Sequence, residues 1–174
     1  MKPADKSLCW IGYTVVFSDT DPIPYGWRNT LEPIDCHWVS QALFQYSMNT
    51  GKTELNDSKL TQMWFSPPQP FLSTNHVPKV DRYFTRRLCL WMPKKMWKAR
   101  LVCPSPECNN RQLMSVGLYQ HVRRVLDEDN YYNLGTEYLQ CSRCLKKVIG
   151  WSEAILQQLG VGHRYMFPAI LTHK

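Results

Sequence analysis

The chain has 174 residues, of which 44% are hydrophobic and 13% aromatic, and its formal net charge is +7. This composition can form the core of one domain, with or without a smaller module, and it excludes a disordered chain. No apolar run reaches the roughly 18 residues of a membrane-spanning helix, and the N-terminal residues lack the apolar stretch of a secretory signal. We therefore expect an intracellular protein whose cysteines stay reduced and available to metals.

The positive charge is concentrated in the second half of the chain. Residues 1–78 hold 5 Lys and Arg against 7 Asp and Glu, whereas residues 79–174 hold 16 against 7. This asymmetry points to a polyanionic partner for the second half, with nucleic acid as the leading candidate. A solubilising surface on an unrelated domain would produce the same count.

The first half is predicted to hold a strand, a loop and a helix. Residues 9–17 are rich in β-branched and aromatic side chains and favour a strand. The prolines and glycine of 18–33 predict a loop. Asp35 is then expected to cap a helix over 37–48, where apolar side chains recur on one face and residues 49–51 end the pattern.

A proline-rich segment separates the two halves. After a short helix or turn over 57–64, residues 66–70 can form neither a helix nor a central strand. We therefore predict two parts. Residues 1–78 form a strand and helix part that packs on the rest, and 79–174 hold the basic segment, a cysteine-rich ribbon and a C-terminal helix.

The second half is predicted to be mostly strands. Residues 88–92 are a continuous apolar run of the buried-strand type. An acidic turn over 127–130 is expected to join two strands, and Ser152 to begin a helix that reaches Leu159 and stops at Gly160. The other predicted strands cover 99–103, 121–126, 131–140 and 146–151.

Four cysteines have the spacing of a zinc ribbon. Cys103 and Cys108 form a C-x4-C pair, Cys141 and Cys144 form a C-x2-C pair, and 32 residues separate the pairs. Zinc takes four ligands at tetrahedral corners, so two cysteine-bearing turns brought together by a hairpin can supply two corners each. Four thiolates close the coordination shell. We therefore predict one structural Zn²⁺ rather than a catalytic one.

Two other interpretations of these cysteines are weaker. A redox pair at Cys141 and Cys144 would require a βαβ context, whereas strands are expected on both sides. A disulfide conflicts with the expected reducing compartment. The remaining cysteines are expected to be small buried residues: Cys9, Cys36 and Cys89.

Basic side chains of the second half alternate with aromatic residues, as in many nucleic-acid-binding surfaces. The tryptophans of 82–100 are expected to lie in the core, and the charges either contact phosphates or are simply solvated. Phosphate contacts of this kind position a protein without reading base sequence. The candidate contacts are Arg86, Arg87, Lys94, Lys95, Lys98, Arg123, Arg124, Lys146 and Lys147.

One pair of carboxylates could support catalysis. Asp19 and Asp21 follow a predicted strand, and paired carboxylates at a strand end can hold Mg²⁺ for phosphoryl chemistry. Because Pro22 and Pro24 follow at once, an ordinary turn explains these residues more simply. A Mg²⁺-dependent nuclease is therefore kept only as the weakest alternative.

Several segments together resemble a family of uncharacterised domains: 64–68, 90–97, 131–134, 141–144 and 162–171. The family is a domain of unknown function in animal and fungal proteins derived from mobile elements, often N-terminal to transposase-like or nuclease-like regions. The resemblance implies a zinc-containing accessory module of a transposon-derived protein that acts on DNA in the nucleus, with a transposase-like protein or region as a partner. It supplies no catalytic residue.

These inferences combine into one prediction. The expected fold is α+β, with a small antiparallel sheet, a four-cysteine zinc ribbon and a few short helices. The expected function is non-enzymatic nucleic-acid binding, with double-stranded DNA as the leading ligand and no membrane partner. A zinc-stabilised protein-interaction module is the main alternative, ahead of the nuclease.

Overall fold

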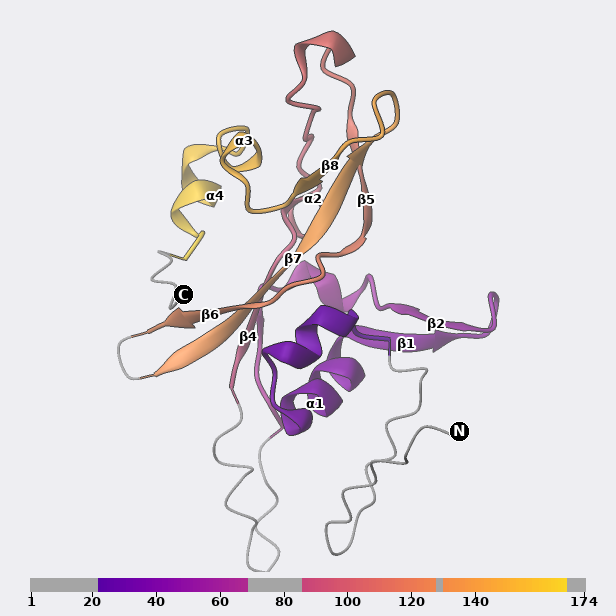
Figure 1. Cartoon of the computed structure of the whole chain (residues 1–174), viewed down its shortest axis with the longest axis vertical. Helices are drawn as coiled ribbons and strands as arrows, with labels where there is room; N and C mark the ends of the chain where they lie inside the picture. Colours follow the sequence, from indigo (N-terminus) through magenta and orange to yellow (C-terminus); the bar gives the residue numbers. More distant parts are fainter. Residues whose placement is uncertain (1–21, 69–85, 128–129, 169–174) are drawn as a thin grey trace, which may run out of the picture.

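A computed structural model describes residues 22–68, 86–127 and 130–168 of the chain (Figure 1). The first part contains η1 (Tyr25–Asn29), α1 (Pro33–Leu43), β1 (Phe44–Ser47), β2 (Lys52–Leu55), η2 (Lys59–Thr61) and β3 (Trp64–Phe65). The second part contains β4 (Leu88–Trp91), α2 (Pro93–Met96), η4 (Pro106–Cys108), β5 (Leu113–Leu118), β6 (Arg123–Leu126), β7 (Tyr131–Cys141), β8 (Lys147–Ile149), α3 (Glu153–Leu156) and α4 (Val161–Tyr165). Within these ranges no helix is long and apolar enough to cross a membrane.

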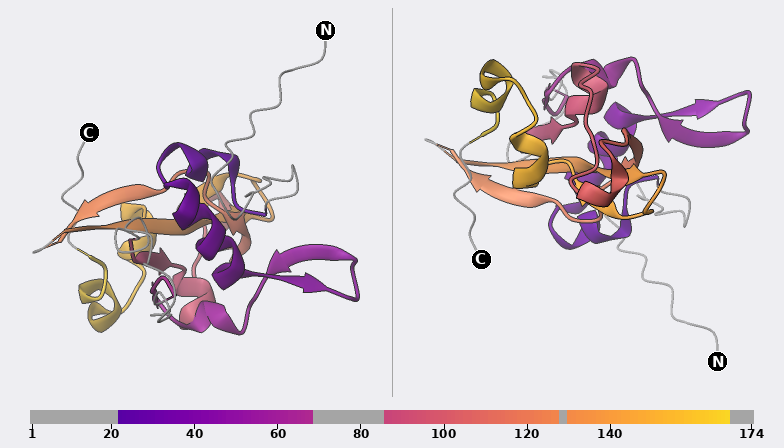
Figure 2. Two further views of the ribbon diagram at one scale, coloured as in Figure 1. Left: turned by 90° about the horizontal axis from the view of Figure 1, so that it is seen from below. Right: turned by 90° about the horizontal axis from the view of Figure 1, so that it is seen from above.

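Strand β7 is the spine of the larger sheet. Its first half pairs with β6 (antiparallel) on one edge and β4 (parallel) on the other. Its second half pairs with β5 and β8, both antiparallel. The short β3 extends the sheet beyond β4, and β1 and β2 form a separate hairpin that projects from the body (Figure 2). The predicted α+β class, with mainly antiparallel sheets and a few short helices, is confirmed, and the parallel β4–β7 pair is an addition to it.

Strand β5 contains a bulge where it pairs with β7. Ser115 lies opposite Leu139, but Leu118 lies opposite Glu137, so β5 carries one residue more than β7 over this stretch. Gly117 has a φ of +112° within the bulge, a conformation that residues with a side chain rarely adopt. A bulge of this kind bends the strand and increases its local twist.

The core lies in two clusters that share the sheet. In the first, Trp27 of η1 and Val39 and Leu43 of α1 pack against Leu88 and Leu90 of β4. The predicted boundary between 1–78 and 79–174 falls within 69–85, outside the described residues, so this division stays a prediction.

The second cluster joins the sheet to the cysteine-bearing end. It includes Trp91, Leu113 and Leu139, together with Ile155 of α3. Aromatic contacts attach the C-terminal helices, since Phe167 packs edge-on against Trp91 with ring centres 4.8 Å apart. The metal-binding end and the sheet are therefore parts of one packed unit.

The predicted helix over 37–48 was wrong at both ends. The helix α1 begins earlier because Pro33, whose fixed φ suits a first helical turn, follows Glu32 at the cap position. Asp35 is not the cap. It is buried in the first turn, where it accepts a hydrogen bond of 2.9 Å from Trp38 Nε1.

Beyond Leu43 the chain forms the β1–β2 hairpin instead of more helix. Tyr46 lies opposite Thr53, an aromatic and β-branched pair that favours strands. Gly51, with a φ of +63°, completes the turn that we had predicted to be a helix end. Local turn chemistry thus overrides the helical spacing of the apolar residues.

Other sequence predictions have mixed outcomes. Four predicted strands and one predicted turn are confirmed with slightly different bounds: 88–92, 121–126, 131–140, 146–151 and the turn at 57–64. The predicted strand at 99–103 forms only an isolated bridge from Val102 to Gln112. The loop expected over 18–33 contains η1. The helix after Ser152 ends at Leu156, no cap hydrogen bond forms from Ser152, and Gly160 precedes the unpredicted α4. The strand predicted over 9–17 lies outside the described residues.

The contact between η1 and the sheet requires glycine at position 26. A side chain at Gly26 would overlap the backbone carbonyl of Gln120, and the neighbouring Trp27 donates a hydrogen bond of 2.7 Å from Nε1 to the carbonyl of Tyr119. We expect Gly26→Ala to destabilise the protein by about 1–3 kcal/mol and to lower Tm by roughly 3–10 °C in thermal unfolding.

Gly162→Ala is the matched control, because a methyl group there meets no atom within 4 Å. It should leave Tm unchanged or slightly raised, since alanine favours a helix more than glycine does. Equal effects of the two substitutions would contradict the close packing of η1 on the β5–β6 connection.

Candidate metal centre

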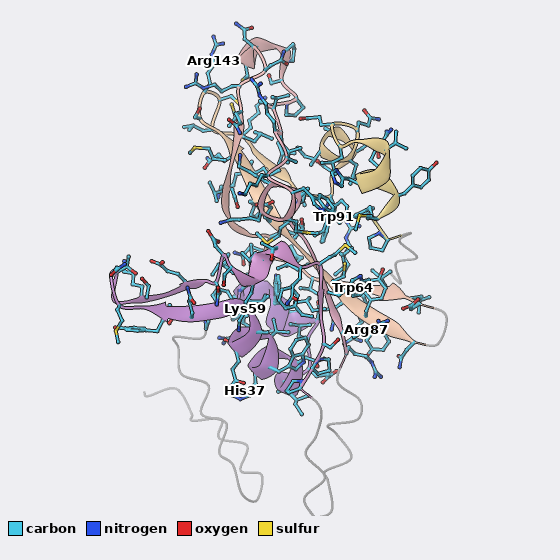
Figure 3. The ribbon with its side chains drawn as sticks, turned by 180° about the vertical axis from the view of Figure 1, so that it is seen from behind. His37, Lys59, Trp64, Arg87, Trp91 and Arg143 are labelled. Atoms are coloured by element: carbon cyan, nitrogen blue, oxygen red, sulfur yellow. The ribbon has the colours of Figure 1, made fainter. Side chains whose placement is uncertain are left out.

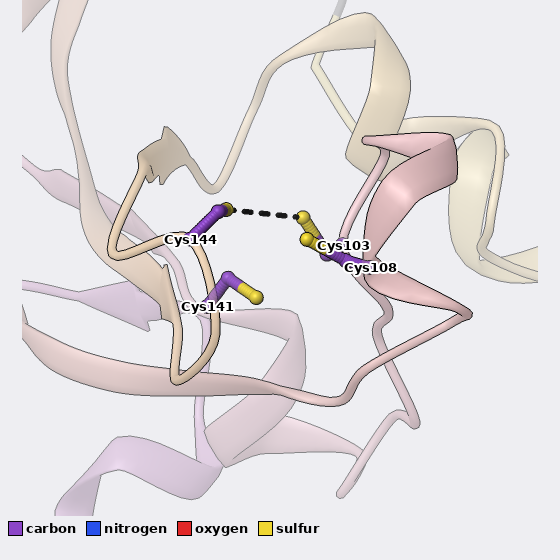
Figure 4. Close-up of side chains that lie close together, drawn as sticks. All are labelled: Cys103, Cys108, Cys141 and Cys144. Carbon is purple, nitrogen blue, oxygen red and sulfur yellow. Dashed lines mark hydrogen bonds between the residues drawn. The ribbon is translucent and has the colours of Figure 1, made fainter.

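Two turns bring the four predicted cysteines together (Figure 4). Cys103 follows the Val102–Gln112 bridge and Cys108 ends η4, so the first pair belongs to the turn that enters β5. Cys141 is the last residue of β7, and Cys144 lies in the turn before β8. Because β5 and β7 pair directly, the two turns end up side by side.

The distances between the sulfur atoms fit a single metal ion. The four Sγ atoms all lie within 4.8 Å of one another, and those of Cys103 and Cys144 are 3.8 Å apart. A tetrahedral site with Zn–S bonds of about 2.3 Å requires S–S separations of about 3.8 Å. A disulfide would require about 2.05 Å. The four cysteines could therefore hold a metal ion such as zinc.

The two turns are built alike. The residue that follows the second cysteine of each pair is in the left-handed region, with φ +48° at Asn109 and +58° at Leu145. The Cys108 amide donates to the carbonyl of Ser105, and the Leu145 amide donates to that of Cys141. Asparagine tolerates this conformation, whereas leucine adopts it at a cost of about 1–2 kcal/mol. Leu145 adopts this costly conformation directly after Cys144, in the turn that carries the second pair of cysteines.

Backbone amides already favour one thiolate. The amides of Cys144 and Arg143 point at Cys141 and lower its pKa to about 6, and the Arg143 amide lies 3.4 Å from its sulfur. Burial, with the neighbouring thiols, raises the pKa of Cys108 to about 12. Without a bound cation, the four neighbouring thiols therefore resist losing all their protons. A divalent cation among them would favour deprotonation, because it attracts the four thiolates.

Two arginines form hydrogen bonds between the two turns. Arg111, just after the first pair, donates from Nε to Ser142 Oγ at 3.0 Å, and Ser142 belongs to the second turn. Arg143 of the second turn donates from Nη1 to the carbonyl of Glu107 in the first turn at 2.6 Å. Neither residue was among the predicted site residues, because spacing in the sequence does not show which side chains form hydrogen bonds between the turns.

The segment that follows α3 forms hydrogen bonds with the residue before Cys103. Gln158 accepts a hydrogen bond of 2.7 Å from the Val102 amide and donates one of 3.0 Å to the Val102 carbonyl. Cys103, Cys108 and Cys141 are buried, and Cys144 is half-buried. Four sulfur donors in such a shell leave no open position, which is the composition of a structural site rather than a catalytic one.

The predicted phosphate contacts do not share one surface. Arg123 and Arg124 are neighbours on β6 and therefore point to opposite faces of the sheet. Arg124 lies over the ring of Tyr131 at 5.2 Å and Arg123 over that of Trp151 at 5.0 Å. Arg86 joins Arg124 on the Tyr131 side, at 4.6 Å from that ring.

Three other predicted contacts are engaged within the protein. Lys94 donates from Nζ to the carbonyl of Leu113 at 2.6 Å, and Lys95 pairs with Asp57 at 2.6 Å. Arg87 pairs with Asp127 at 3.2 Å, beside Trp64 and far from the metal-binding end (Figure 3). The remaining three are exposed: Lys98, Lys146 and Lys147. The carboxylates suggested for a nuclease, Asp19 and Asp21, lie outside the described residues.

A family model described as "Domain of unknown function (DUF6729)" matches residues 27–174. The chain belongs to this family. The match spans α1, the whole sheet and all four cysteines, so the DUF6729 domain includes the candidate metal centre. Comparison with curated proteins and with solved structures found no match. The predicted link of such a family to zinc and to transposase-like proteins remains a prediction.

The metal centre can be tested through stability. Structural zinc contributes on the order of 10–16 kcal/mol in small metal-folded units, so a strong chelator should lower Tm by 10 °C or more. Cys144→Ser should lower Tm similarly and abolish the chelator response, since one ligand is lost. Differential scanning fluorimetry with and without chelator measures both effects.

Cys36→Ser is the control. Cys36 is buried in α1, away from the four-cysteine cluster, and its sulfur lies 4.0 Å from the carbonyl of Leu31, which a hydroxyl could also approach. This variant should keep the full chelator response. A wild-type protein that is insensitive to chelation would contradict a structural metal.

Proposed function

We propose that this chain is a zinc-stabilised nucleic-acid-binding module whose ligand is DNA. The observation that carries the proposal is the positive charge along the sheet that ends in the metal centre. The segments 109–126 and 138–152, which supply β5, β6, the end of β7 and β8, contain no Asp or Glu. Their cations are Arg111, Arg123, Arg124, Arg143, Lys146 and Lys147.

The metal does not cancel this charge. Four thiolates around one Zn²⁺ carry a net charge of −2 and Glu107 of the first turn adds −1, so the six cations of these segments leave an excess of +3. Arg143 lies between two ligands and Lys146 lies two residues after one, so a bound metal would hold their backbone in place. Fixed cations lose less conformational freedom on contact with phosphates than mobile ones do.

Zinc is the metal that this donor set favours. Thiolate ligands in a tetrahedral arrangement are typical of structural zinc, and paired cysteines on two turns are its common protein form. The role of the ion is to hold the two turns that carry the cations. No residue of the site is proposed to act in catalysis.

The cellular context is proposed from resemblance alone. Similarity to domains of mobile-element-derived proteins supports a nuclear role beside a transposase-like protein or region. DNA is the polymer on which such proteins act, which is the reason for preferring it to RNA.

A protein-interaction module is the second candidate, and one observation favours it. The β1–β2 hairpin projects from the body (Figure 2) and exposes 63% of Tyr46 and 88% of Met48. Exposed apolar side chains on a projecting hairpin are suited to a protein partner. This surface lies in the part of the chain that carries little positive charge.

Salt dependence separates the two candidates. Binding of a labelled 20-base-pair duplex should weaken as salt rises, with a log–log slope of about −0.9 for each phosphate contacted. Replacement of Lys146 and Lys147 by glutamine should weaken binding for all sequences and reduce the slope by about 2. Fluorescence anisotropy at several salt concentrations provides both numbers.

The matched control replaces Lys52 and Lys59, two exposed lysines of the first part, by glutamine. This double variant has the same net charge as the first and should bind nearly as the wild type does. If no duplex or single strand binds at 50 mM salt, the nucleic-acid proposal is wrong and the interaction module is favoured.

A further inference from the structure

A row of aromatic side chains lies where β7 meets the ends of β5 and β8. Tyr138 of β7 and Tyr119 after β5 meet edge to face, with ring centres 5.0 Å apart at an interplanar angle of 85°. Tyr119 also meets Trp151 at 5.4 Å and His121 at 5.3 Å. Tyr119 and Tyr138 are only half-buried, whereas Trp151 is buried, so only the two tyrosines can present part of a ring to solvent.

Cations stand at both ends of this row. Lys147 Nζ lies 5.4 Å from the ring centre of Tyr138, and the Arg123 guanidinium lies 5.0 Å from that of Trp151. Both cations are exposed, as is His121. A carboxylate occurs nowhere in 109–126 or 138–152, which supply every member of the row.

Two other aromatic and basic clusters of the described residues differ in this respect. In one, Arg87 lies over Trp64 but pairs with Asp127. The other surrounds Tyr131. Arg86 and Arg124 lie over Tyr131, but Glu32 is 3.6 Å from the Arg124 guanidinium, which also donates to the carbonyl of Thr30. Part of its charge is thus neutralised within the protein. The Tyr119–Tyr138 row is the better site for an external polyanion.

We propose that Tyr119 and Tyr138 of this row stack the unpaired bases of a single-stranded nucleic acid, with Lys147 and Arg123 on its phosphates. The inference rests on the proposed function, because both require nucleic-acid binding, and it adds a preference for single strands. In a duplex the base faces are already stacked on one another, so aromatic side chains gain little from it. In a single strand the faces are free and stack on aromatic rings whatever the base.

Lys147 does not block the ring of Tyr138. A cation held to an exposed ring contributes less than a stacked base does, so a base can replace the ammonium group. The displaced ammonium then stays within reach of the adjoining phosphate, since a flexible four-carbon chain carries it. Stacking and phosphate contact are therefore compatible at one position.

The test compares two labelled probes, a 20-nucleotide oligothymidylate and a mixed-sequence 20-base-pair duplex, with the zinc-loaded full chain at 50 mM salt. Tyr138→Leu keeps an apolar side chain but removes the aromatic face. We expect it to weaken oligothymidylate binding about tenfold, a free-energy change of about 1.4 kcal/mol, and to change duplex binding less than twofold. Tyr138→Trp should restore the single-strand affinity.

Tyr46→Leu is the control, since Tyr46 is also a strand tyrosine but lies on the distant β1–β2 hairpin. It should leave both affinities unchanged. Equal single-strand affinities for Tyr138→Leu and wild type would overturn the inference while leaving duplex binding, and so the proposed function, intact. Competition by polyglutamate at equal charge would also overturn it, whereas failure of both probes to bind would remove the inference and the proposed function together.

Discussion

The convergence of four cysteine sulfurs is the interaction on which the second half of the structure depends. The turn that contains Cys103 and Cys108 has little regular structure of its own, with one isolated bridge and one short 3-10 helix. It is held by hydrogen bonds to Gln158 and Ser142 and by its sulfur contacts with the second turn. A metal ion would convert four crowded thiols into the strongest link between the turns.

The long strand β7 connects this end to the rest of the molecule. It ends at Cys141, and its central Gly135 lies directly under the ring of Trp27, which in turn donates to the Tyr119 carbonyl. The first core and the metal-binding turns are therefore supported by the same strand. The rows of side chains proposed to bind nucleic acid stand on this spine, so loss of the metal would disturb their spacing as well as the stability of the fold.

The sequence could predict what depends on local pattern. Cysteine spacing predicted the cluster, and local residue patterns predicted β4, β6, β7 and β8 but neither β3 nor β5. What it could not predict depends on which segments pair with each other, whether they are near or far apart in the chain. The helical spacing of apolar residues continues past Leu43, but the turn at Gly51 and the cross-strand pairs stabilise a hairpin there instead. Likewise, nine basic residues looked alike in sequence, whereas pairing on β6 sends Arg123 and Arg124 to opposite faces.

X-ray absorption spectroscopy at the zinc edge, on protein purified without added metal, tests the central claim most directly. The account predicts about one zinc per chain with four sulfur neighbours at about 2.3 Å and no nitrogen or oxygen in the first shell. A protein without bound metal, or a shell that contains nitrogen or oxygen ligands, would contradict a closed site formed by Cys103, Cys108, Cys141 and Cys144.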